Sequence, residues 1–350
     1  MVAPSRSEHT GSSRPIRAGC CPREQSAPGY RASPDIDFQR AARKDKQQSD
    51  GLPGGYAPAD SPAPVPNGGT SMSLSTSETR DISRANATGL PPVVFVHGLW
   101  ILASSWQPWR TLFEENGYAT IAPGWPDDPA TTGEARANPR AFAGKSVGQV
   151  TSHMAEAIAA LRQKPAIIGH SFGGLITQQL AGQGLGTVSV AIDSAPFRGV
   201  LPLPLSALRS AMPVIANPAN YRRAIMLTYE QFRYSFANAV SENEARRLYE
   251  AYPVPGSGIP LFQAATANIN PFTEIKVDTK NPDRGPTLLI TGEKDHIAPH
   301  AIAAATYRKQ KRNPAVTQIQ EIPDRGHSLV FDSGWQDVAE AALAFIKTTR

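Results

Sequence analysis

The hydrophobic pattern of residues 90–350 alternates between two kinds of stretch. Short runs of β-branched, aromatic and other apolar residues predict strands at 92–97, 117–122, 166–168, 187–193, 287–291 and 316–322. Between most of these runs, apolar residues recur at three- and four-residue spacing, which predicts helices with one buried face. Strands that alternate with helices pair in parallel through right-handed crossovers. The pattern therefore predicts an α/β class, a mostly parallel sheet of about six strands with helices on both faces.

This alternation lapses between residues 196 and 281. Apolar residues there follow helical spacing, near 206–212, 229–239 and 242–252. An insertion of this length between two strands is expected to form a helical cap over the carboxyl edge of the sheet, where open α/β sheets bind their ligands. We expect its apolar residues to line an acyl or alkyl pocket, and we interpret its arginines as solvated surface charges.

Residues 1–88 follow neither pattern. The stretch is rich in Ser, Pro, Gly, Arg and Asp, with chain breakers clustered at 53–55 and 62–69. Because so little apolar surface cannot offset the entropy of ordering, we expect a disordered N-terminal extension at 1–88 and a folded domain at 89–350. Met72 is a candidate initiator, and a genuine disordered tail is the equal alternative. The intact mass of the protein expressed from its native gene would distinguish the two.

Composition narrows the class of protein further. Hydrophobic residues make up 40% of the 350 residues and charged residues 19%, so a sizeable core is available. The formal net charge of +5 comes from scattered basic residues, which gives no reason to expect nucleic acid or a membrane surface as a partner. No apolar stretch has the length of a membrane-spanning helix, and the first residues do not contain the apolar h-region that a secretory signal would have. We therefore expect no stable membrane anchor and a cytoplasmic location.

Cysteine and histidine spacing argues against disulfides and metals. The two cysteines, Cys20 and Cys21, are adjacent and lie in the expected extension. The folded domain is therefore expected to hold by packing alone. Because that domain has no cysteine, no HExxH sequence and no close histidine pair, we expect no metal site.

One pentapeptide carries the clearest chemical signal, Gly169-His170-Ser171-Phe172-Gly173. An apolar run precedes it and helical spacing follows it, so Ser171 is predicted at a sharp turn from strand to helix, known as a nucleophile elbow. Such a turn holds the serine at positive φ and needs small residues on either side. Chance alone gives G-x-S-x-G about one time in ten in a chain of this length. The motif therefore indicates a nucleophilic serine only if a base and an acid occur where this fold would place them.

Two side chains occur where a nucleophilic serine needs partners. Asp295 follows the fifth predicted strand, and His327 lies in the loop after the last one. A carboxylate at a strand end can orient a histidine, which then acts as the base for Ser171. Asp193 also ends a predicted strand and remains the alternative acid.

The loop after the first predicted strand has the sequence His-Gly-Leu-Trp at 97–100. A His-Gly pair lets this backbone approach the elbow closely, so the amides of Leu99 and Phe172 are the candidate donors of an oxyanion hole. Trp100 and Trp106 are candidate lining residues of a substrate pocket.

Residues 90–350 resemble the α/β-hydrolase superfamily, particularly its single-domain bacterial esterase and lysophospholipase-like members. The resemblance is carried by 97–98, by the elbow 169–174, by 292–295 and by 326–327. The order of candidate serine, acid and base along the chain is also that of this superfamily. Two features depart from the family pattern. The first loop is His-Gly-Leu-Trp rather than His-Gly-Gly-Gly, and no N-terminal hairpin precedes Leu90.

The resemblance implies cofactor-free hydrolysis of a carboxylic ester of a small or lipid-like substrate. In that mechanism Ser171 attacks the carbonyl, His327 takes its proton, Asp295 holds the imidazole, and water then cleaves the acyl-enzyme. Other chemistry on the same triad stays open, namely thioester or carbon-carbon bond hydrolysis, hydroxynitrile lysis, or a perhydrolase and haloperoxidase-like reaction. Outside enzymes, the alternative is a ligand-binding receptor built on a hydrolase fold.

Overall fold

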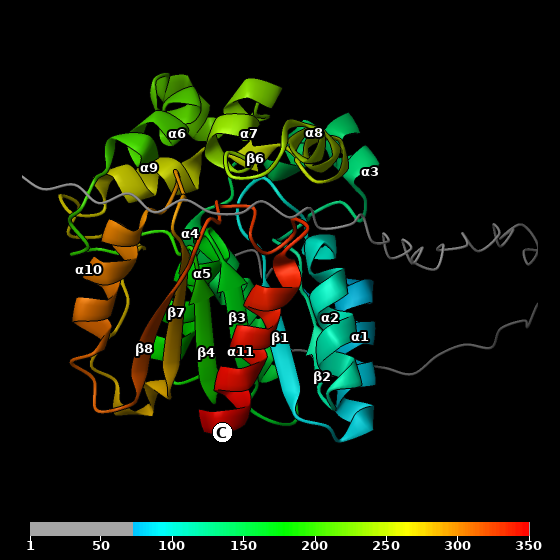
Figure 1. Ribbon diagram of the computed structural model, residues 1–350. Helices are drawn as coiled ribbons and strands as arrows, with labels where there is room; N and C mark the ends of the chain where they lie inside the picture. The colour runs from blue at the N-terminus through cyan, green and yellow to red at the C-terminus, as the bar shows by residue number, and fades with distance from the viewer. Residues whose placement is uncertain (1–72, 350) are drawn as a thin grey trace, which may run out of the picture. The chain divides into compact units, whose positions relative to one another are not determined.

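The computed structural model describes residues 73–349 (Figure 1). The expectations of disorder before residue 73 and of Met72 as the initiator lie outside the described residues. These described residues belong to one compact unit, which is built around a six-stranded sheet.

All neighbouring strands of this sheet pair in parallel. In sequence order they are β1 (Pro92–Val96), β2 (Ala119–Ile121), β3 (Ala166–His170), β4 (Val188–Ile192), β7 (Thr287–Gly292) and β8 (Thr317–Ile322). Every residue of the first five is buried, as expected for apolar runs covered on both faces, whereas β8 at one edge alternates between half-buried and exposed. The predicted α/β class and six-stranded sheet are confirmed.

The strand order β2-β1-β3-β4-β7-β8 reverses direction at β1. The chain steps from β1 to β2 toward one edge, and from β3 onward toward the other. In open α/β sheets, ligands bind beyond the carboxyl ends of the strands at such a reversal. The topology therefore predicts that a ligand binds at the loops that follow β1 and β3.

Helices cover both faces of the sheet. Because crossovers are right-handed, the helix in the connection from β1 to β2 lies on the opposite face from the helices in the connections that run toward β8. The first is α2 (Gln107–Glu115), and the others include α4 (Val147–Ala159) and α5 (Phe172–Gly182), which pack with each other (Figure 1). The last helix, α11 (Trp335–Thr349), follows β8 and packs with α2. α10 (His300–Gln310) packs against β7 and β8.

An additional helix, α1 (Thr76–Thr88), corrects the expected domain boundary. Ser75 and Glu78 form a capping box at its start, and Gly89 ends it with a φ of 67°. The expectation of disorder up to residue 88 is therefore wrong for 76–88. The helix lies against β2 and buries only two side chains, Ile82 and Ala85, so its apolar pattern is too sparse to identify it from the sequence.

Replacing Ile82 with alanine is expected to lower the free energy of unfolding by about 2–4 kcal/mol, because it leaves a cavity between α1 and the core. Urea denaturation of the full chain measures the change. Arg80→Ala is the matched control, since Arg80 is exposed on the same helix and alanine is a good helix former. Equal stability of the Ile82 variant and the wild type would contradict the packing of α1.

The segment between β4 and β7 supplies a helical insertion above the sheet (Figure 1). Its elements are α6 (Leu205–Ile215), β5 (Ala224–Ile225), α7 (Tyr229–Ser235), α8 (Glu242–Ala251), β6 (Gly256–Ser257) and α9 (Ile259–Thr266). The two short strands pair antiparallel. The insertion has the helical character and the position expected at 196–281.

None of the helices in residues 73–349 combines the length and the apolar character needed to cross a bilayer. The cytoplasmic location stays a prediction.

Candidate functional site

Ser171 occupies a tight turn between β3 and α5. Its φ of 58° and ψ of −122° lie outside the regions that side-chain-bearing residues usually adopt, so the predicted positive φ is confirmed. Ser171 N donates to Ile192 O at 2.9 Å, and Ala195 N donates to Ser171 O at 3.0 Å. Strain of this kind costs about 1–3 kcal/mol and persists only where the surroundings enforce it. The end of β4 holds the serine turn in place.

The two glycines of the pentapeptide have no room for a side chain. A Cβ on Gly169 would lie 2.2 Å from Gly173 O, and a Cβ on Gly173 would lie 2.1 Å from Val96 O. These contacts bring the start of α5 against the end of β1. The amides of the first turn of α5 have no acceptor within the helix, which leaves the Phe172 N–H available to an anion beside this turn.

Gly98 brings the loop after β1 against the serine. A Cβ there would lie 2.8 Å from Ser171 Cβ and 3.5 Å from Ser171 Oγ. The next residue, Leu99, therefore carries its amide beside the elbow. Trp100 follows with a φ of 70°, an uncommon conformation for a large side chain. Its indole Nε1 donates to Ile225 O at 3.0 Å, which fastens the loop to β5 of the insertion.

His97 fixes the shape of the same loop. Its buried ring hydrogen-bonds through Nδ1 to Gly98 O at 2.9 Å, and its Nε2 accepts from Trp125 N at 3.2 Å. The Asp128 carboxylate lies 3.2 Å from the same Nε2. Because both ring nitrogens are engaged, His97 supports the loop and has no free nitrogen for a substrate.

His327 and Asp295 meet beyond the carboxyl ends of the strands. His327 Nδ1 lies 2.8 Å from Asp295 Oδ2, and both side chains are buried. Asp295 Oδ1 accepts from Ile297 N at 2.6 Å, which fixes the carboxylate. A carboxylate on Nδ1 selects the tautomer that carries its proton there. The other nitrogen, His327 Nε2, is buried and has no hydrogen-bond partner within residues 73–349.

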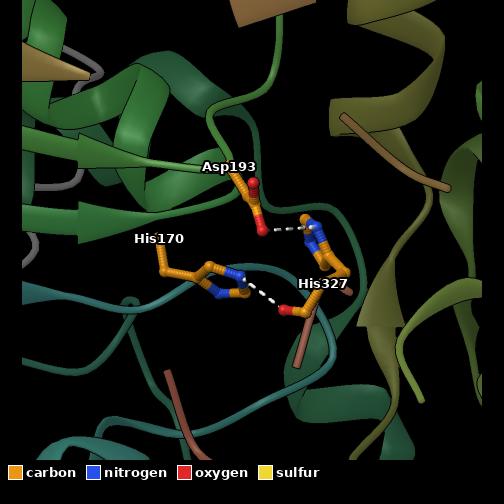
Figure 2. A group of neighbouring side chains, drawn as sticks. All are labelled: His170, Asp193 and His327. Carbon is orange, nitrogen blue, oxygen red and sulfur yellow. Dashed lines mark hydrogen bonds and ion pairs between the residues drawn. The ribbon is translucent and has the colours of Figure 1, made fainter. Parts of the chain in front are cut away.

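Asp193 is a second buried carboxyl group at this site (Figure 2). Its Oδ1 accepts from Gly292 N at 2.8 Å, whereas its Oδ2 lies 3.9 Å from His327 Nδ1, beyond hydrogen-bond range. Burial, and then the negative charge of Asp295, raise the pKa of Asp193 well above its usual value. Two carboxyl groups thus flank one imidazole, and the contact distance favours Asp295 as the partner of His327.

Two residues that the sequence analysis did not single out hold the His327 loop. His170 Nε2 donates to His327 O at 2.9 Å, and the two rings lie 4.5 Å apart (Figure 2). Burial, and then the charge of His327, lower the pKa of His170 well below its usual value, so this ring stays neutral. Phe236 of the insertion contacts the His327 ring edge-on at 4.9 Å, and its carbonyl accepts from Ser328 N. His170 occupies a position that the G-x-S-x-G motif leaves unspecified, so the motif gives it no role. No sequence signal indicates that Phe236 contacts the histidine.

His170, Asp193 and His327 also offer possible metal ligands within 4.8 Å of one another (Figure 2). However, His327 Nδ1 is bonded to Asp295, and His170 Nε2 to a backbone carbonyl. The raised pKa of Asp193 favours its neutral form, whereas metal ligands must be deprotonated. A bound cation would have to break these hydrogen bonds. The three side chains therefore suit a hydrogen-bonded network better than a metal site. The absence of a metal requirement stays a prediction.

Ser171 Oγ and His327 Nε2 are not hydrogen-bonded to each other, since that nitrogen has no partner in the described part of the chain. The serine turn and the histidine loop are nevertheless adjacent, because His170 directly precedes Ser171 and binds His327. A serine hydroxyl moves between three staggered χ1 positions, and catalytic hydrogen bonds are often long before substrate binds.

A cavity of about 220 Å³ opens beside Ser171. Its wall is largely apolar and comes from the elbow, the loop after β4, α6, α9 and the segment after β7; it includes Phe172, Val200, Leu208, Leu261 and Ile297. Trp100 also lines the cavity.

Trp106, by contrast, lies in the core and does not line this cavity. It stacks on Phe95 at 5.1 Å and meets Trp109 edge-on at 5.0 Å, and it is almost fully buried. The expectation that Trp106 lines the pocket is therefore wrong. Its helical spacing with Trp109 and Phe113 reflects an aromatic cluster between β1 and α2.

This arrangement, a parallel sheet with a strained serine turn after β3 and a histidine loop after β8, is that of an α/β hydrolase. The sequence model of the Alpha/beta hydrolase family matches residues 93–341. The chain therefore belongs to the alpha/beta hydrolase family. No curated protein matches the chain in sequence.

Solved structures with the same fold include several hydrolases. The monoacylglycerol lipase of Paleococcus ferrophilus is 20% identical with a TM-score of 0.52, covering 75% of this chain and 96% of its own. A pyrethroid hydrolase from Sphingobium faniae is 18% identical with a TM-score of 0.51, covering 73% and 96%. A thermophilic esterase from Thermogutta terrifontis is 16% identical with a TM-score of 0.52, covering 74% and 90%. At these identities the likeness establishes the fold.

Proposed function

We propose that this protein is a serine hydrolase that cleaves a carboxylic ester through an acyl-enzyme. The observation that carries the proposal is the 2.8 Å bond from His327 Nδ1 to Asp295 Oδ2 beside the strained Ser171 turn. That bond leaves Nε2 unprotonated and available as a base, which is what a serine nucleophile requires. Family membership and the esterase and lipase activities named for the solved structures support the same class.

The reaction follows from the residues around the elbow. Rotation of Ser171 about χ1 carries Oγ toward His327 Nε2, which takes the hydroxyl proton as Oγ bonds to the ester carbonyl carbon. The amides of Leu99 and Phe172 stabilise the resulting oxyanion. His327 returns the proton to the leaving alcohol, and Asp295 stabilises the transient imidazolium. Water then attacks the acyl-enzyme with His327 again as base, which releases the acid and regenerates Ser171.

The cavity supports a small or lipid-like ester with an apolar acyl group. Its walls around Ser171 are mostly aliphatic, and each methylene buried there contributes about 0.8 kcal/mol. We therefore expect kcat/KM to rise about tenfold from p-nitrophenyl acetate to p-nitrophenyl butyrate. An acetate preference over every longer ester would contradict an acyl pocket.

Labelling with a fluorophosphonate probe tests the nucleophile. We expect one adduct per chain, located at Ser171 by peptide mass spectrometry, because the probe reacts with serines activated by a neighbouring base. Ser210→Ala is the matched control, since Ser210 is buried, lines the same cavity and should be dispensable for labelling. An adduct elsewhere, or none at Ser171, would overturn the assignment. An adduct without turnover of the ester series would favour another reaction on the same residues or a ligand-binding receptor.

A further inference from the structure

Exposed apolar side chains of residues 73–349 gather on the insertion. Seven of the nine large ones belong to it, and the other two are Leu90 and Val316. The five most exposed of all, each between 71% and 89% exposed, are Leu201, Leu203, Leu205, Ile269 and Phe272. These five residues are called the apolar rim below. Scattered apolar residues are normal on a protein surface, but a group of this size marks an interaction site.

The rim residues come from two stretches that are joined to each other. Asn268, directly before Ile269, accepts from Gly199 N at 2.6 Å and donates to Val200 O at 3.1 Å. Arg198 donates to Pro271 O at 3.1 Å, beside Phe272. The loop before α6 and the loop after α9 are therefore held side by side and together form one surface.

This surface is continuous with the mouth of the cavity beside Ser171. Leu201 and Leu203 belong to the rim and also line that cavity, and Asn268, which joins the two stretches, lines it as well. An apolar molecule held against the rim therefore has a direct apolar route to the serine.

The two stretches that carry the rim contain arginines and, up to Glu274 two positions after Phe272, no acidic residue. Residues 194–229 contain four arginines, at 198, 209, 222 and 223, and no Asp or Glu, and residues 251–273 contain no charged residue. All four arginines are exposed. Arg209 lies one helical turn after Leu205, so it shares that side of α6, and its guanidinium is held over the Tyr234 ring at 4.0 Å.

We propose that the apolar rim docks on the surface of anionic lipid aggregates, with its leucines, Ile269 and Phe272 in the acyl boundary and the arginines at the headgroups. Apolar side chains with arginines on the same stretches match that interface, because burial of apolar area and attraction to anionic headgroups add. A second copy of this chain docked through the same face would bring Arg198 and Arg209 toward their own counterparts, which disfavours it as the occupant. Docking would deliver lipid-like substrate directly to the cavity.

Vesicle co-sedimentation of the full chain tests the docking. The probes are phosphatidylcholine vesicles and vesicles that contain roughly one-third phosphatidylglycerol. We expect binding to the anionic vesicles to be at least about tenfold stronger than to the neutral ones, and to weaken as salt is raised. Because sedimentation does not require catalysis, its outcome is independent of the proposed esterase activity.

Variants separate the rim from the rest of the surface. The combination Leu205→Ser, Ile269→Ser and Phe272→Ser should lower binding to anionic vesicles about tenfold or more, while hydrolysis of monomeric p-nitrophenyl acetate stays unchanged, because these residues do not line the cavity. Leu90→Ser with Val316→Ser is the matched control and should bind like the wild type. Arg209→Gln with Arg222→Gln should remove most of the preference for anionic vesicles.

Three results would overturn the proposal. The first is a wild-type chain that does not sediment with anionic vesicles. The second is a rim variant that binds them as well as the wild type. The third is a wild-type dimer in analytical ultracentrifugation that becomes a monomer in the rim variant, because that result would assign the rim to a second copy.

Discussion

Replacing Ser171 with alanine is expected to lower kcat/KM for p-nitrophenyl butyrate by about ten-thousand-fold or more. The hydroxyl is the atom that forms the acyl-enzyme, and without it the imidazole of His327 has no nucleophile to activate. The residual rate would come from binding and the oxyanion donors alone. Steady-state kinetics, with purity sufficient to exclude contaminating esterase, measures the change.

Folding must be separated from chemistry in this comparison. Alanine keeps a Cβ at a φ of 58°, so the turn stays strained and the fold should be retained, which circular dichroism and urea denaturation check. The Ser210→Ala variant controls for loss of a hydroxyl in the same cavity. Wild-type turnover by a folded Ser171→Ala variant would remove this residue from the mechanism.

The second large effect is expected from asparagine substitutions at the two buried carboxyl groups, Asp295 and Asp193. Asp295→Asn should lower kcat/KM by about a thousandfold to ten-thousandfold, because an amide in place of the carboxylate favours the wrong imidazole tautomer and cannot stabilise the imidazolium. Asp193→Asn should lower it less than about tenfold. The distances to His327 Nδ1, 2.8 Å for Asp295 and 3.9 Å for Asp193, are the basis for the difference.

The raised pKa of Asp193 is the reason we expect asparagine to be tolerated there. Burial, and then the negative charge of Asp295, raise the pKa of Asp193 well above its usual value, which favours the uncharged acid. Asparagine has nearly the same shape as that acid and keeps the acceptor for Gly292 N–H. Asp193→Ala leaves that donor unpaired and should lower the free energy of unfolding by about 1–3 kcal/mol. A large kinetic loss in Asp193→Asn with a small one in Asp295→Asn would make Asp193 the acid.

The sheet was predictable because its signal is local. Five of its strands are apolar runs buried on both faces, and each can be predicted from its own residues without knowing which strands lie beside it. The start of α4 is set locally as well, by a capping box that Ser146 and Gln149 form across three positions. Helix α1 was missed because it buries only Ile82 and Ala85 and otherwise resembles the polar stretch before it.

The candidate site was only partly predictable, because sequence signals are local and the contacts between its side chains are not. Ser171, Asp295 and His327 each follow a strand, so parallel topology brings them to one edge without further information. The sequence left Asp193 open as the acid, and only the distances to His327 distinguish the two. Trp100 and Trp106 look equivalent in the sequence, yet one lines the cavity and the other belongs to the core.

By itself, the sequence determined the α/β class, the parallel sheet and the strained serine turn, since each follows from the spacing of apolar residues or glycines within a few positions. Tertiary structure alone decided which carboxylate meets His327 and that His170 and Phe236 hold its loop. It also decided that the rim residues, which lie up to 71 positions apart, belong to one surface. The physical reason is that burial, pKa and patch formation depend on neighbours in space, which the order of residues along the chain does not specify.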